Sequence, residues 1–81
     1  MSALTKKELD VRTLIPIKRH EKLLKLFKDL PAGESFVFIN DHDPKPLYYE
    51  FRSIFGDVVG WKYLKREPEE WKVCVTRTDA D

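Results

Sequence analysis

The chain changes character within the stretch F-V-F-I-N-D-H-D-P-K-P-L, residues 36–47. Its first four residues are aromatic or β-branched, which is typical of a central strand covered by other elements. The next four, residues 40–43, are polar, and the prolines after them favour the first turn of a helix. The stretch therefore predicts a buried strand, a short polar loop and a helix, in that order.

Amphipathic elements flank this stretch on both sides. Residues 16–30 place Leu23, Leu24 and Phe27 on one side of a helix and a row of lysines on the other. Residues 44–55 form a second amphipathic helix that Gly56 closes. Alternating apolar residues predict a short strand at 9–12 and two more at 58–64 and 71–76, joined by a polar connection at 65–70.

The order β-α-β-α-β-β predicts an α/β fold, specifically an α+β two-layer sandwich. Two amphipathic helices can cover only one face of a mixed four-stranded sheet, because each has one apolar side. The first β-α-β unit is expected to be right-handed, with parallel strands. We expect one domain at residues 9–77, between a flexible lead-in at 1–8 and a tail at 78–81.

Composition excludes several classes of function. The 81 residues include 15 basic and 14 acidic side chains, a balance that gives no overall attraction to nucleic acid or membrane. The lysines of the first helix have no aromatic residue between them to stack on a base, so they favour a solvated helix face. A single cysteine allows no internal disulfide, and no apolar run approaches the roughly 20 residues of a membrane span. We expect a cytoplasmic protein.

Polar and charged side chains gather where the first two strands end. Parallel strands bring their carboxyl ends to one edge of a sheet, where open α/β sheets usually bind ligands. The predicted ligand-binding or interaction rim consists of Asp10, Arg12, Arg19, His20, Asn40, Asp41, His42 and Asp43.

A divalent metal ion is the most specific ligand that the residues of this rim predict. His20 and His42 are candidate metal ligands, because imidazole and carboxylate suit zinc, iron, manganese or nickel. Alternatively, Asp41 and Asp43 share an ion with one outside group, since neighbouring side chains of extended chain point opposite ways. A purely structural interpretation has Asp43 capping the second helix, Asp41 closing a turn and His20 packing between helix and sheet.

The sequence supports anion binding and nucleophilic catalysis less strongly than metal binding. Pro44 and Pro46 remove two of the N–H groups that a helix start offers to an anion, so arginine side chains would have to hold it. Cys74 lies in the middle of an alternating strand, which favours a small inert side chain over a reactive thiol. We predict no catalytic residue. The uncovered sheet face, with Val37 and Ile39 or Phe36 and Phe38, is expected to be an apolar contact surface.

Motifs along nearly the whole chain resemble a known family. They are L-D-V-R at 9–12, R-H at 19–20, G-E at 33–34, N-D-H-D-P-K-P-L at 40–47, W-K-Y-L at 61–64 and W-K-V at 71–73. Together they resemble an uncharacterised bacterial family, the domain of unknown function numbered twenty-two forty-nine. That family is similar in fold to the TusA/SirA sulfur carriers, which place a catalytic cysteine before a proline at the first helix.

The resemblance carries expectations about function. At the corresponding position this chain reads L-I-P-I, residues 14–17, which has no thiol. We therefore expect a non-catalytic accessory or carrier-like domain whose rim binds a metal, a small ligand or a protein partner. The resemblance implies a partner such as a hemerythrin-like or redox protein. The alternative is a sulfur or redox carrier, or a small enzyme, that acts through the same rim or through Cys74.

Overall fold

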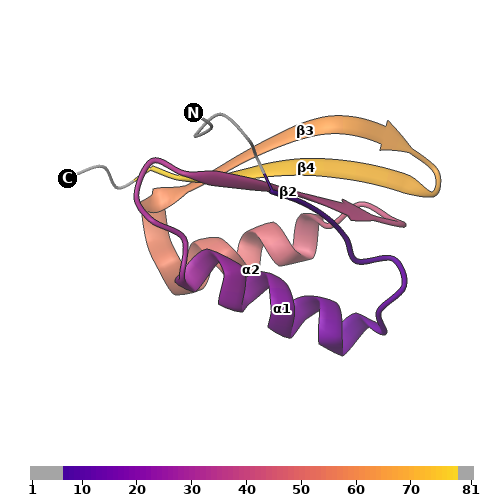
Figure 1. The fold of residues 1–81 in the computed structure, drawn as a ribbon, viewed down its shortest axis with the longest axis horizontal. Coiled ribbons are helices and arrows are strands. Elements are labelled where there is room, and N and C mark those ends of the chain that lie inside the picture. The colour runs from indigo at the N-terminus through magenta and orange to yellow at the C-terminus, as the bar shows by residue number, and fades with distance from the viewer. Residues whose placement is uncertain (1–6, 79–81) are drawn as a thin grey trace.

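A computed structural model describes residues 7–78 as two layers, a sheet and a pair of helices (Figure 1). The elements are β1 (Lys7–Asp10), α1 (Pro16–Lys28), β2 (Ser35–Asn40), α2 (Lys45–Phe55), the 3-10 helix η1 (Gly56–Val58), β3 (Val59–Glu67) and β4 (Glu70–Arg77). The predicted β-α-β-α-β-β order and the α+β sandwich are confirmed.

The four strands form one mixed sheet in the order β1-β2-β4-β3. β1 runs parallel to β2, while the other two pairs are antiparallel. Both helices lie on the same face of the sheet, and both begin at the end where β1 and β2 stop (Figure 1). This arrangement places the two helix starts and the β2–α2 loop side by side.

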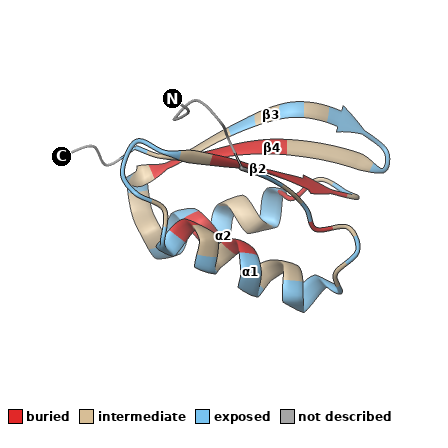
Figure 2. Cartoon of the chain, in the orientation of Figure 1, coloured by how far each residue is buried: buried red, intermediate tan, exposed pale blue. Residues whose placement is uncertain are grey.

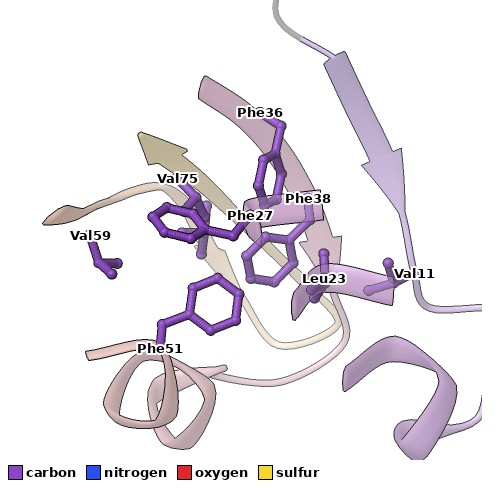
Figure 3. Packing of buried hydrophobic residues seen from close by; sticks show 9 residues of the cluster. Val11, Leu23, Phe27, Phe36, Phe38, Phe51, Val59 and Val75 are labelled. Atoms are coloured by element: carbon purple, nitrogen blue, oxygen red, sulfur yellow. The ribbon is translucent and has the colours of Figure 1, made fainter. Parts of the chain in front are cut away.

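The core lies between the sheet and the helices, and β2 and β4 hold most of the buried residues (Figure 2). Phe27 of α1 and Phe51 of α2 are fully buried, with ring centroids 5.5 Å apart. They pack against Phe36 and Phe38 of β2, whose rings point toward the helices (Figure 3). Because side chains alternate along β2, Phe36 and Phe38 both point toward the helices, and Val37 and Ile39 point to the open face of the sheet.

The open face of the sheet differs from the apolar contact surface expected from the sequence. Val37 and Ile39 point to this face, yet they are only 5% and 9% exposed. Lys72 of β4 reaches Glu8 of β1 with 3.0 Å between nitrogen and oxygen. Because β2 lies between those two strands, this ion pair crosses over it. Long charged side chains thus cover the apolar residues, and the predicted exposed patch is wrong.

The β3–β4 hairpin extends further than the sequence suggests. Residues 65–70, predicted as a polar connection, are mostly strand, because Lys65 pairs with Lys72 and Glu67 pairs with Glu70. Only Pro68 and Glu69 form the turn. The prediction failed because this part of the hairpin buries little apolar surface, so its sequence lacks the alternation that marks a half-buried strand.

Smaller differences concern the ends of elements. β1 begins at Lys7 and ends at Asp10, so residues 7 and 8 of the predicted lead-in belong to a strand. α1 ends at Lys28, where Asp29 follows as C-cap and its N–H bonds to the Lys25 carbonyl. The rest of the predicted lead-in, residues 1–6, and residues 79–81 of the predicted tail lie outside the described residues. Within residues 7–78 no helix has the length and apolar character needed to cross a membrane.

Candidate functional site

An open pocket of about 190 Å³ lies between the first turns of α1 and α2 and the loop that follows β2. Its lining combines apolar and polar side chains: Pro16, Arg19, His20, Leu23, Asn40, His42, Pro44, Pro46, Leu47 and Glu50. Four of the eight predicted rim residues, Arg19, His20, Asn40 and His42, therefore face one cavity. The apolar residues and Glu50 were not predicted.

Arg19 organises the wall of the pocket from α1. Its Nη1 donates to Asn40 Oδ1 at 2.7 Å and to Asp41 Oδ1 at 2.8 Å, and its Nη2 donates to Asp41 Oδ2 at 3.1 Å. Its remaining donors bond to the main-chain oxygens of Leu14 and Arg12. The side chain is only 13% exposed, so this guanidinium ties the β2–α2 loop to α1. With its donors occupied, it is a positioning group.

Asp41 links Arg19 to His42. The hydrogen bonds from Arg19, and then that with His42, hold the pKa of the Asp41 carboxyl well below its usual range. His42 Nδ1 lies 2.8 Å from Asp41 Oδ1. An ionised carboxylate only accepts hydrogen bonds, so Nδ1 must carry a proton. In the neutral ring of His42, Nε2 is then the unprotonated nitrogen, and no described residue bonds to it.

His20 of α1 and Glu50 of α2 form a second imidazole–carboxylate pair in the pocket lining. His20 Nε2 lies 3.1 Å from Glu50 Oε2, and both side chains are partly exposed. The pair bridges α1 and α2. The contact is an ion pair by distance, and neither ring nitrogen of His20 makes a hydrogen bond within residues 7–78. His20 is not the buried packing residue of the structural interpretation, since it reaches the surface.

Asp43 and Asn40 hold the loop from inside. Asp43 Oδ1 accepts from the Lys45 amide at 3.1 Å and from the Tyr63 hydroxyl at 2.8 Å. Asn40 is 6% exposed and donates from Nδ2 to the His42 carbonyl at 3.1 Å. The interpretation of Asp43 as the cap of the second helix is wrong in detail, because the N-cap is Pro44 and Asp43, one residue earlier, bonds to the amide of the first helical residue. Asp43 therefore anchors α2 to β3 and does not line the pocket.

The start of α2 offers few amides to an anion. Pro44 and Pro46 have no N–H, the Lys45 amide bonds to Asp43, and the Leu47 and Tyr48 amides bond to the Pro44 carbonyl. Any anion in the pocket must therefore be held by side chains.

Asp10 and Arg12 lie outside the pocket. Arg12 donates from Nε and Nη2 to the two carboxylate oxygens of Asp10 at 2.9 and 2.7 Å. These bonds lower the pKa of Asp10 from 3.8 to about 2. Arg12 Nη1 also donates to the Glu69 carbonyl at 3.2 Å, at the hairpin turn. The sequence did not predict the length of this hairpin. Arg12, to which Asp10 is bonded, therefore contacts the hairpin turn, and neither residue lines the pocket with the four other predicted rim residues that do.

The histidines do not form a metal site with the residues around them. Across residues 7–78 no group of three or more histidine, cysteine, aspartate or glutamate side chains is placed to hold a metal ion. Asp41 is bound to Arg19, and Asp43 is bound to Tyr63 and Lys45, so these two aspartates do not share an ion here. The predicted metal therefore gains no support from this geometry.

Cys74 and Glu50 show what sequence reasoning found and missed. Cys74 is 5% exposed on the sheet, as expected for an inert side chain. Glu50 went unnoticed because its role depends on how the two helices pack. A signal was present, since Glu50 follows Pro46 and Leu47 by four and three residues and so shares their side of α2.

Comparison with known proteins identifies the family. The chain belongs to the family described as "Uncharacterized conserved protein (DUF2249)", whose model matches residues 8–77. Neither the curated proteins nor the solved structures gave a match. The family resemblance seen in the motifs is confirmed, and the similarity in fold to the TusA/SirA carriers stays a prediction.

Proposed function

We propose that this member of the DUF2249 family is a non-catalytic binding domain, and that its site is the pocket between the starts of α1 and α2. It binds a small ligand or one side chain of a partner protein. The supporting observation is the pocket itself, whose lining combines both histidines, Glu50 and Arg19 with apolar side chains. The cytoplasm is the proposed location.

Size favours a small occupant. Pockets for drug-sized ligands commonly measure about 300–1,000 Å³, whereas this one measures about 190 Å³. Such a volume suits a short organic molecule or a single side chain of a partner. Interfaces often concentrate their binding energy in one such anchor, surrounded by residues that exclude water.

Exposed apolar side chains near the pocket support a protein partner. Four of the five large exposed apolar residues belong to the helix layer or lead into it: Ile15, Ile17, Tyr49 and Ile54. Ile17 precedes His20 by one helical turn, and Ile54 follows Glu50 by one turn, so both flank the histidine–glutamate pair. The helix layer, and not the open sheet face, is therefore the better docking surface.

Affinity capture from the source cell's extract tests this proposal. Wild type is compared with His20→Ala, His42→Ala and, as a matched surface control, Lys62→Ala on the open sheet face. We expect the wild type and Lys62→Ala to retain the same protein or small molecule, identified by mass spectrometry, and the histidine variants to lose it. Equal retention by all four proteins would contradict the proposed site.

The alternative, a sulfur or redox carrier, depends on Cys74. Its burial between β2 and β3 leaves the thiol little access to a partner. Transfer of a persulfide that is lost in Cys74→Ala would favour the carrier over the binding domain.

A further inference from the structure

The pocket lining includes His20, His42 and Glu50, and each histidine lies beside a carboxylate, Glu50 for His20 and Asp41 for His42. His42 Nδ1 is hydrogen-bonded to Asp41, whereas His20 Nε2 lies at ion-pair distance from Glu50, 3.1 Å. Nε2 of His42 and both ring nitrogens of His20 have no hydrogen-bond partner among residues 7–78. In a neutral imidazole one nitrogen accepts a hydrogen bond, and in a protonated one both donate. Protonation therefore leaves only hydrogen-bond donors on both rings.

The charge of the site changes sign in the same step. With neutral imidazoles, Arg19 is outweighed by Asp41 and Glu50, one positive charge against two negative, which leaves −1. Protonating His20 and His42 adds two positive charges and brings the site to +1. Asp43 and Lys45 at the start of α2 cancel each other, so the further charge around the site comes from α1.

The surroundings favour an anion once the rings are protonated. Residues 16–29 carry five basic side chains and two acidic ones, and Lys18 is paired with Glu21 only loosely, at 3.7 Å. Both helices begin at the pocket, since Pro16 of α1 and Pro46 of α2 line it, so their positive dipole ends lie beside it. Since the Arg19 side chain and the first α2 amides are already bonded, the two imidazoles are the cationic side chains of the lining that can hold the anion.

The apolar lining residues indicate the chemistry of the part of the ligand beyond its charged group. Pro16, Leu23, Pro46 and Leu47 line the cavity and can cover a short aliphatic chain. We propose that the pocket is a proton-gated receptor for a carboxylate on a short apolar chain, held between the protonated rings of His20 and His42. This inference rests on the proposed function and names the chemistry of its ligand.

The test uses three probes with the same carbon chain: n-butyrate, n-butanol and n-butylammonium. Binding is followed by the imidazole and backbone NMR signals at about pH 5.5 and about pH 8, on either side of the range in which histidines ordinarily titrate. We expect n-butyrate to shift the signals of both histidines at the lower pH and to bind about tenfold more weakly at the higher pH, a factor that matches one lost charge-assisted hydrogen bond. Equal affinity of n-butyrate at the two pH values would overturn the gating.

Variants separate the role of each wall. His42→Gln removes the imidazole from an exposed position and should weaken n-butyrate binding about tenfold at the lower pH. Lys62→Gln removes one positive charge from the far side of the sheet and should leave binding unchanged. Glu50→Gln removes a negative charge from the pocket and should strengthen binding. If Lys62→Gln weakens binding as much as His42→Gln, general charge explains the result and the proposal fails.

The probes also distinguish this inference from the proposed function. If n-butanol or n-butylammonium shifts the pocket residues and n-butyrate does not, the carboxylate proposal fails and the pocket remains a binding site. If none of the three shifts residues around the pocket, both fail. The blocked tripeptide N-acetyl-Ala-Glu-Ala-amide tests the source: tighter binding than n-butyrate indicates a side chain of a partner protein, and weaker binding indicates a free carboxylic acid.

Discussion

Arg19 donates five hydrogen bonds to four residues, and these bonds join α1 to the segments after β1 and β2. A planar guanidinium offers its donors in a fixed fork, so it can hold Asn40 and Asp41 in one arrangement. An ammonium has no such geometry. The shape of the pocket therefore depends on the identity of this residue as well as on its charge.

Replacement of Arg19 by lysine should lower the free energy of unfolding by about 2–3 kcal/mol, because partly buried acceptors lose their partners. Urea unfolding followed by circular dichroism measures this change. As a control, Lys25→Met removes an exposed pair with Asp29 and should change stability by less than about 0.5 kcal/mol. A loss in Arg19→Lys no larger than in the control would show that the network contributes little.

Acid should destabilise the protein through Asp10 and Asp41. Both carboxyls have a pKa below the ordinary value in the folded chain, so the folded state binds protons less readily than the unfolded one. Their contribution is present above about pH 4 and is lost as the pH falls toward 2, the pKa of Asp10. The melting temperature of the wild type should fall as the pH is lowered from about 4 to about 2. The melting temperature of Asp41→Asn should fall less steeply over the same range. Parallel curves for the two proteins would refute this cause.

The start of α2 shows how one element is set in place. Asp43 accepts from the Lys45 amide within the loop and from the Tyr63 hydroxyl of β3. The first contact is local and lies where the sequence predicted a helix cap by Asp43. The second joins residues twenty positions apart and depends on the strand order, which alternation alone does not give.

Tyr63→Phe should lower stability by about 1 kcal/mol, since it deletes one hydrogen bond to a carboxylate and keeps the aromatic ring. Combining it with Asp43→Ala in a double-mutant cycle isolates the contact. The two losses should add to more than the loss in the double variant. Strict additivity would mean that the hydroxyl does not anchor α2.

At the scale of the whole molecule, exposed apolar side chains on the two layers test which layer a partner contacts. Ile17 on the helix layer is 62% exposed, and Leu64 of β3 is 47% exposed. Ile17→Ser and Leu64→Ser should both leave stability within about 0.5 kcal/mol of wild type, as surface changes usually do. Only Ile17→Ser should reduce capture of the partner from cell extract. Reduced capture by Leu64→Ser alone would move the docking surface away from the helix layer.

The sequence predicted the fold well because its evidence is local. The apolar periodicity of residues 16–30 and 36–39 depends on neighbours a few positions away. It predicted the site in part, since the parallel pairing of β1 and β2 brings Arg19 and His42 to one edge. Contacts between distant elements were beyond it: Glu50 meets His20 only when α1 and α2 pack, and Arg12 turns to Glu69 only because the hairpin is long.

Backbone NMR mapping with the captured molecule tests most directly whether the pocket is the binding site. Adding that molecule to labelled wild-type protein should shift amide signals mainly in residues 16–23 and 40–50, which line or frame the pocket. Signals from β3 and β4 outside the core should stay in place. Shifts centred on the open face of the sheet, around Lys62 and Lys72, would contradict the account.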